Sequence, residues 1–332
     1  MTEINRRDLL ARSALTPALS LAAGASLMAA ATPAQATLSA AGQQVPGIYR
    51  YKIGALELTA VNDGVNRIAF PDGFVRNAST DDINKALEAA FLPKDQFPLT
   101  FTPLLVNTGS KLVLIDTGNG PQGTSTTVGK LPANLGWAGV KPADVDMVVI
   151  SHFHPDHING LRTSEGSLAY PNAEILVPAP EWAFWMDDGE MSRAPEALQA
   201  NFKNVRRVFK DFDSRINRYE WDKELVPGIT SLAAPGHTPG HTAFMIASGN
   251  DKLLVQSDTS NLPAAFMVNP DWQLRFDMDG AKAVETRRKL YDMASADRLP
   301  IAGYHIPFPA VGNIEKNGDG YRFVPTFWNP AL

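Results

Sequence analysis

The sequence predicts an α+β fold in which two β-sheets pack face to face and helices cover their outer faces. Strand-like segments fall into two groups along the chain, and each group is accompanied by helical segments and ends at a loop that bears histidine. Because a sheet must bury its apolar face against another layer, two such groups in one chain favour two packed sheets. The chain has 332 residues, of which 44% are hydrophobic, as is ordinary for a globular protein.

The first group of elements lies in the first third of the chain. Residues 56–61 place apolar and polar side chains on alternate positions, as in a half-buried strand. Apolar residues at helical spacing then predict a helix over residues 83–91, behind the cap candidates Ser79 and Thr80. The next two strands are expected at residues 103–106 and 111–115.

The second group begins at residues 146–151, a nearly continuous apolar run that is typical of a buried strand and ends directly before His152. The stretches 63–77 and 261–279 are expected to be long loops. The remaining predicted elements are strand 175–177, helices 181–186 and 195–210, strands 229–233, 242–247 and 252–256, helix 280–296 and strand 299–304.

Composition removes several classes of function. The formal net charge is −5, so no basic surface that binds a phosphate backbone is expected, and nucleic acid is not an expected partner. The chain contains no cysteine, which excludes disulfides, thiolate nucleophiles and zinc held by cysteine. Any metal must therefore be held by histidine and carboxylate side chains.

Residues 1–36 have the features of a targeting segment. Arg6 and Arg7 precede a weakly apolar stretch at 14–31, and Ala34-Gln35-Ala36 is a small-x-small cleavage site. The run around the two arginines resembles a twin-arginine export signal. We therefore expect a periplasmic or secreted protein.

A membrane anchor is the alternative for this segment. The apolar stretch is short for a bilayer span and contains Pro17, so stable membrane insertion is not expected. Residues 37–47 are rich in Ala, Gly and Gln and are expected to be a linker. Residues 48–332 are then expected to form a single domain.

The central motif is Ser151-His152-Phe153-His154-Pro155-Asp156-His157. Three imidazoles and a carboxylate directly after a buried strand can converge only if the chain turns sharply, as Pro155 favours. Imidazole nitrogen and carboxylate oxygen are the ligands of zinc, iron and manganese in hydrolytic sites, and such a turn can serve two adjacent ions. The alternative is a solvated loop without metal, which would suit a lone pair of such residues better than four.

A second motif, Pro235-Gly236-His237-Thr238-Pro239-Gly240-His241, forms a tight loop in which His237 is the ligand candidate. His241 suits equally a histidine that supports the ligands from behind. Asp258 and His305 each follow a predicted strand and are placed to enter the same site. The chain has only six histidines, and all of them lie at strand ends or within these loops.

The order His152-x-His154-x-Asp156-His157, then His237, Asp258 and His305, resembles the metallo-β-lactamase superfamily. The resemblance implies an αββα sandwich of two mixed sheets with the metal site along one edge. It implies that one metal is held by His152, His154 and His237, that a second is held by Asp156, His157 and His305, and that Asp258 bridges them. Asp116, in Leu114-Ile115-Asp116-Thr117-Gly118, matches the aspartate that orients ligands in this family, although a plain strand-ending turn is the alternative.

The resemblance extends to one branch of the family. Residues 47–50, 58–60, 106–114 and 320–325 are similar to methyl parathion hydrolase and its lactonase and arylesterase relatives. Trp185 matches an aromatic residue in the wall of that branch's substrate pocket, although its helical spacing also suits a core tryptophan. Between residues 120 and 130, Pro, Gly, Ser and Thr replace an aromatic-bearing stretch, which implies a more open or polar pocket.

These observations together predict a dinuclear metal-dependent hydrolase that cleaves lactones, aryl esters or phosphotriesters. The resemblance implies two divalent ions, with zinc as the first expectation and iron, manganese and cobalt as alternatives. The expected nucleophile is a metal-bridging hydroxide, with Asp258 as the bridging ligand and Asp156 as a carboxylate that can take up its proton.

Two other functions remain as alternatives. The scaffold can be a non-catalytic metal-binding or ligand-binding protein, which the completeness of the ligand set disfavours. A glyoxalase-type thioester hydrolase shares the ligands but usually has a basic C-terminal region, which this sequence lacks. Members of the family are often dimeric, so a homodimer is compatible with the resemblance.

Overall fold

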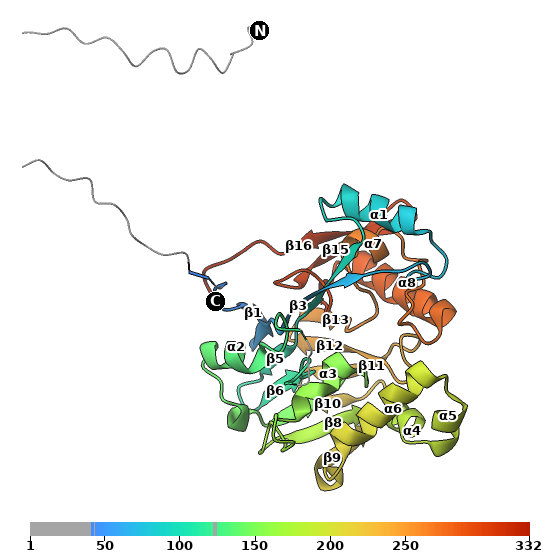
Figure 1. Ribbon diagram of the computed structural model, residues 1–332. Coiled ribbons are helices and arrows are strands. Elements are labelled where there is room, and N and C mark those ends of the chain that lie inside the picture. Colours follow the sequence, from blue (N-terminus) through green and yellow to red (C-terminus); the bar gives the residue numbers. More distant parts are fainter. Residues whose placement is uncertain (1–40, 43, 122–124) are drawn as a thin grey trace, which may run out of the picture. The chain divides into compact units, whose positions relative to one another are not determined.

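The computed structural model describes residues 41, 42, 44–121 and 125–332 (Figure 1). Within it, Val45–Leu332 form one compact unit. The predicted export signal, residues 1–36, lies outside the described residues, as does part of the expected linker at 37–47. No helix in the described part of the chain is both long enough and apolar enough to cross a bilayer.

The described strands form two seven-stranded sheets and one two-stranded sheet. The strands of the first sheet, in spatial order, are β1 (Ile48–Ile53), β2 (Leu56–Val61), β5 (Leu104–Asn107), β6 (Leu112–Ile115), β7 (Met147–Val149), β8 (Glu174–Pro178) and β9 (Ile216–Tyr219). Those of the second sheet are β10 (Glu224–Val226), β11 (Ile229–Ala233), β12 (Thr242–Ser248), β13 (Asp251–Val255), β14 (Pro300–Ala302), β15 (Val311–Asn317) and β16 (Gly320–Pro325). Both sheets are mixed, because β6 to β9 pair in parallel in the first and β13 pairs in parallel with β14 in the second.

Alternation along the strands divides the apolar residues between two layers. In β6, Val113 and Ile115 belong to the core between the two sheets, whereas Leu114 points to the opposite face. From the second sheet, Phe244 and Leu253 pack into the same inter-sheet core. Successive side chains of a strand point to opposite faces, so each sheet has an inner face toward the other sheet and an outer face that needs a cover.

Helices provide that cover on both outer faces. Apolar residues of α2, α3, α4 and α6 pack on the first sheet, and those of α8 pack on the second. The helices are α1 (Thr80–Ala89), α2 (Leu131–Trp137), α3 (Pro155–Ile158), α4 (Ala179–Trp185), α5 (Asp188–Arg193), α6 (Glu196–Phe209), α7 (Pro263–Phe266) and α8 (Gly280–Ala296), with 3-10 turns at Pro142–Asp144, Asn159–Leu161 and Asp213–Arg215. The predicted α+β sandwich with two facing sheets is confirmed.

The structure differs from the sequence prediction in the two expected long loops. The stretch 63–77 contains β3 (Gly64–Ala69), which pairs with β4 (Gln96–Phe101) as a separate antiparallel two-stranded sheet, and the stretch 261–279 contains α7. The partner of β3 follows only after α1, so no local turn revealed the pairing. The expectation that Phe91 lies on the apolar face of a helix is also wrong, because α1 ends first and Phe91 takes a left-handed backbone with its side chain 98% exposed.

Candidate metal centre

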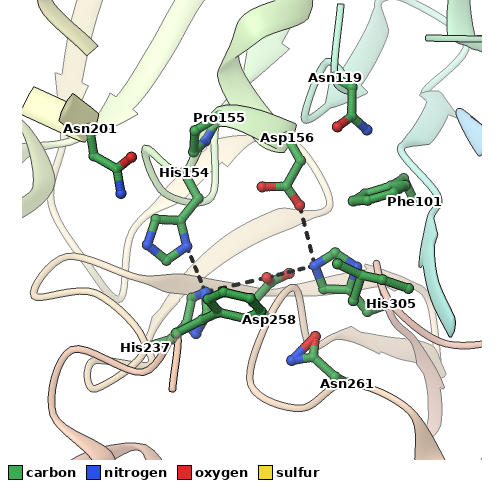
Figure 2. Close-up of a pocket in the computed structure, with 12 residues that line it drawn as sticks. Phe101, Asn119, His154, Pro155, Asp156, Asn201, His237, Asp258, Asn261 and His305 are labelled. Atoms are coloured by element: carbon green, nitrogen blue, oxygen red, sulfur yellow. Dashed lines mark hydrogen bonds and ion pairs between the residues drawn. The ribbon is translucent and has the colours of Figure 1, made fainter. Parts of the chain in front are cut away.

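The predicted metal ligands come together from loops that follow four strands. His152, His154, Asp156 and His157 follow β7, His237 follows β11, Asp258 follows β13 and His305 follows β14. Figure 2 shows five of these side chains converging from different segments on one cavity. Their ligand atoms form two groups, and within each group they lie within 4.8 Å of one another. The groups are His152, His154 and His237, and Asp156, His157, Asp258 and His305.

The short helix α3 produces the sharp turn that this convergence requires. Pro155 occupies its first turn, where the missing N–H costs nothing and the fixed φ suits a helix. His154 precedes the helix in an extended conformation, and the backbone N–H of His157 donates to its carbonyl oxygen at 3.0 Å. The turn therefore separates His154 from Asp156 and His157, which belong to different ligand groups.

Asp258 belongs to the second group but also approaches the first. Its Oδ2 atom is 3.3 Å from Nε2 of His237 and 2.9 Å from Nε2 of His305. Its Oδ1 atom is 3.3 Å from Nε2 of His157. Asp258 is the side chain whose two oxygens face ligands of both groups, which is the position expected of a bridging carboxylate.

The buried polar atoms of this cluster fit a pair of bound cations. Nε2 of His152, Nε2 of His157 and Oδ1 of Asp258 are all buried and have no hydrogen-bond partner among the described residues. Burying such atoms unpaired is costly, and these three face the interior of the cluster. Nitrogen and oxygen ligands in this number suit zinc, iron, manganese or cobalt.

Burial and the neighbouring charges divide the histidines by pKa. Burial lowers the pKa of His154 to about 3 and that of His152 well below its usual range. For His237 and His305 burial also acts to lower the pKa, but hydrogen bonds and charges from the adjacent aspartates outweigh it and raise the pKa of each to about 9. Burial opposes ionisation of Asp258, yet the surrounding imidazoles hold its pKa well below the usual value.

Asp116 orients one ligand of the cluster, His157, through a contact with its Nδ1 atom. Its Oδ2 atom is 2.8 Å from Nδ1 of His157, and its two oxygens accept hydrogen bonds from the backbone N–H and the hydroxyl of Ser151, both at 2.8 Å. Because Nδ1 of His157 is engaged by Asp116, Nε2 is the nitrogen that faces the cluster. Such contacts orient imidazoles around a metal and raise their basicity.

His241 does not face the cluster with a free nitrogen. Its Nδ1 donates to the carbonyl oxygen of Ala234 at 2.7 Å, and its Nε2 accepts from the backbone N–H of Asp258 at 3.0 Å. Both ring nitrogens are therefore occupied, and the imidazole fixes the backbone that presents Asp258.

Three supporting residues were not predicted from the sequence. Oδ1 of Asp277 is 2.8 Å from Nδ1 of His237, and the hydroxyl of Tyr304 donates to the carbonyl oxygen of Asp156 at 2.6 Å. The buried carboxylate of Glu181 accepts four hydrogen bonds that join the two histidine loops. Its donors are the backbone N–H groups of Phe153 and Gly240, the indole N–H of Trp185 and the hydroxyl of Thr238. No short motif surrounds these residues, so spacing gave no signal for them.

A cavity of about 310 Å³ opens over the ligands (Figure 2). Its wall combines site residues with apolar and amide side chains. The lining residues are Leu99, Phe101, Asn119, His154, Pro155, Asp156, Asn201, His237, Asp258, Asn261, Phe276 and His305.

The prediction that Trp185 forms a wall of the substrate pocket is wrong. The side chain is fully buried in the core between α4, α6 and the first sheet, where it packs on Phe202. Its indole N–H donates to Glu181 instead of facing the cavity. Phe101 and Phe276 provide the aromatic rings of the cavity wall.

Comparison with known proteins agrees with this geometry. Residues 102–305 match the family model of the metallo-beta-lactamase superfamily. The chain belongs to this superfamily. The match extends from the end of β4 to His305 and so includes all seven ligand residues.

Curated relatives of this superfamily member include lactonases. The N-acyl homoserine lactonase of Bacillus cereus is 26% identical over 163 residues, which are 46% of this chain and 57% of the relative. The N-acyl homoserine lactonase AttM of Agrobacterium fabrum is 31% identical over 126 residues, which are 35% of this chain and 41% of the relative. The matched regions thus span about half the length of these relatives.

Two solved structures resemble the chain over a larger part of its length. AidC, described as a dizinc quorum-quenching lactonase in complex with a product, has a TM-score of 0.81 and 28% identity, covering 86% of this chain and 100% of that chain. The hydrolase AbOPH has the same TM-score of 0.81 with 26% identity and the same coverage of both chains. These similarities support the lactonase-like branch of the family.

Proposed function

We propose that the protein is a dinuclear metal-dependent hydrolase that opens lactone rings, with N-acyl homoserine lactones as the leading substrates. The observation that carries this proposal is the complete set of seven metal-ligand side chains, five of which line a cavity of about 310 Å³. The relatives named above provide the substrate class. The ligand set is typical of divalent zinc, with iron, manganese and cobalt as alternatives.

Each ligand has a position that suits one role. His152, His154 and His237 would hold one ion, Asp156, His157 and His305 would hold the other, and Asp258 would contact both. The bound ions would provide a hydroxide nucleophile near neutral pH and polarise the carbonyl oxygen of the substrate.

The chain's own residues provide the remaining steps. Asp156 and Asp258 both line the cavity, and Asp156 is the more accessible of the two, with its side chain 20% exposed compared with 3% for Asp258. It is therefore placed to accept the proton released when the nucleophile attacks. Leu99, Phe101 and Phe276 form an apolar wall that binds the hydrocarbon part of a substrate and displaces water from it.

Aryl esters and phosphotriesters are the second class of substrate. The same ions would polarise a carbonyl or a phosphoryl oxygen, so the metal centre alone would not discriminate between them. The alternative of a non-catalytic metal-binding protein is disfavoured because the cavity leaves the ligand cluster accessible to a small molecule.

The test compares kcat/KM for N-hexanoyl-homoserine lactone, phenyl acetate and methyl parathion on the same zinc-reconstituted enzyme. A lactone value that leads by at least about tenfold supports the proposal. A lead for methyl parathion would make the protein an organophosphate hydrolase. Absence of turnover on all three, with the ions bound, would favour the non-catalytic alternative.

We also propose that the protein is exported to the periplasm or secreted by the twin-arginine route. Arg6, Arg7 and the cleavage site at Ala34-Gln35-Ala36 support this proposal. Cell fractionation of the full chain and of an Arg6→Lys, Arg7→Lys variant tests it. Retention of the wild type in the cytoplasm, with the segment still attached, would reject export.

A further inference from the structure

Asn119 lies in the cavity wall directly after the Asp116-Thr117-Gly118 turn. The carboxylate of Asp63 accepts two hydrogen bonds from it. The backbone N–H of Asn119 donates to Oδ2 of Asp63 at 2.8 Å, and its side-chain Nδ2 donates to the same oxygen at 3.0 Å. The other oxygen, Oδ1, accepts from the backbone N–H of Leu131 at 2.8 Å. Asp63 is only 1% exposed, so these contacts are shielded from water.

This contact determines which end of the Asn119 carboxamide faces the cavity. The partners of Asp63 at Asn119, Gly129 and Leu131 are all N–H donors, so both carboxylate oxygens act as acceptors. An acceptor can face only the NH₂ end of an amide, because the other end is itself an acceptor. The oxygen Oδ1 of Asn119 is therefore the end turned away from Asp63, and Asn119 lines the cavity. Figure 2 shows it on the side of Asp156, with the nitrogen turned away.

The close approach of Asp63 depends on Gly118. A Cβ atom at this position would lie 2.7–2.8 Å from the carboxylate of Asp63, and the backbone has φ of +77°. A residue with a side chain would therefore be strained there and would push Asp63 away. The local backbone is thus adapted to the contact that orients Asn119.

We propose that Asn119 is a specificity-determining residue whose Oδ1 accepts a hydrogen bond from an N–H group of the substrate, and that Asp63 is its positioning residue. This assignment rests on the proposed lactonase function. Simple lactones, aryl esters and phosphotriesters present only acceptor atoms, whereas an N-acyl amino-lactone also presents one amide donor. The half-buried Oδ1 acceptor of Asn119 pairs with the amide and is left unpaired by the other substrates.

The experiment compares two lactones that differ in one group. N-hexanoyl-homoserine lactone carries an amide N–H, and α-hexanoyloxy-γ-butyrolactone has an ester oxygen in its place. Ring opening by the zinc-loaded enzyme is followed for both, and each kcat/KM is divided by the alkaline hydrolysis rate of the same lactone to remove differences in ring reactivity. The wild type is expected to prefer the amide by about tenfold, as one hydrogen bond provides.

The variant Asn119→Ala is expected to bring this ratio to about one by lowering kcat/KM for the amide alone. Asn201→Ala is the matched control, since it removes another carboxamide from the cavity wall and is expected to keep the ratio. Asp63→Asn can turn an NH₂ group toward Asn119, and in folded, zinc-loaded protein it is expected to reduce the ratio as well. The result for Asn119→Ala tests the role of Asn119 even if Asp63→Asn does not fold.

The outcomes separate this assignment from the proposed function. Equal normalised kcat/KM for both lactones in the wild type, or an equal loss on both in Asn119→Ala, would overturn the role of Asn119 while leaving lactone hydrolysis in place. Failure of the wild type to open either ring would reject the proposed function itself.

Discussion

Oδ1 of Asp277 lies 2.8 Å from Nδ1 of His237, and this contact turns the Nε2 atom of His237 toward Asp258. Asp277 is itself buried, and its second oxygen lies 3.5 Å from the guanidinium of Arg287, which is 1% exposed. The imidazole is thus held by a chain of buried partners that begins in α8. A carboxylate behind an imidazole fixes its tautomer and increases its strength as a ligand.

Asp277→Asn is therefore expected to weaken one of two zinc-binding steps by roughly 10–100-fold. The change keeps the shape of the side chain and removes its charge. Competition with a chromophoric chelator measures both steps. Asp279→Asn is the matched control, because Asp279 caps α8 two residues later and does not contact a ligand. Unchanged affinity for both ions in Asp277→Asn would contradict the supporting role.

Trp185→Phe is expected to reduce stability and to leave catalysis unchanged. The indole is fully buried, and loss of its hydrogen bond leaves a buried oxygen of Glu181 with one donor fewer, which costs about 1–3 kcal/mol in the free energy of unfolding. Phe276→Ala, which shortens a residue of the cavity wall, is expected to raise KM instead. Denaturant unfolding and lactone kinetics on both variants distinguish the two positions. An increase in KM for Trp185→Phe without loss of stability would indicate that Trp185 contacts the substrate instead of packing in the core.

The features that the sequence predicted are those with a local signal. The helix at 280–296 and the strand at 229–233 have the expected bounds, because their patterns are long or bounded by turns. The candidate ligands could be recognised in the sequence because four of them lie within six residues and each of the others follows a predicted strand. The prediction of two facing sheets followed from the division of the predicted strands into two groups along the chain.

The features that were missed depend on contacts between distant segments. Glu181 bonds to Phe153 and Gly240, which lie 28 and 59 residues away, so no neighbouring pattern marks it as a support of the histidine loops. Trp185 has the same helical spacing whether it faces a core or a cavity, and only the packing of α6 decides between them. The pairing of β3 with β4 was missed for the same reason, because α1 separates the two strands in the sequence.

Removing the ions from the loaded enzyme is expected to lower its thermal unfolding midpoint. The ligand atoms come together only in the folded chain, so the ions stabilise that state by about 4 kcal/mol when free zinc is roughly 1,000 times the Kd. For a chain of this size the shift is on the order of 10 °C. Differential scanning calorimetry before and after chelation measures it. Zinc is expected to restore the midpoint and magnesium is not, since magnesium prefers all-oxygen sites. Equal midpoints with and without zinc would show that the cluster does not hold it.

Asp258→Asn is expected to reduce metal content and activity together. The two oxygens of Asp258 face His237 and His305 on one side and His157 on the other, and an amide provides only one acceptor and no charge. Zinc per chain should fall from two ions to about one, and kcat for lactone opening should fall at least about tenfold, because the variant loses one negative charge and one ligand oxygen that both ions would share. Metal analysis and steady-state kinetics on the same preparation measure both quantities. Asp251→Asn, at the exposed start of the same strand β13, is the matched control and should retain two ions and full activity. Full occupancy and full activity in Asp258→Asn would show that Asp258 does not bridge the ions.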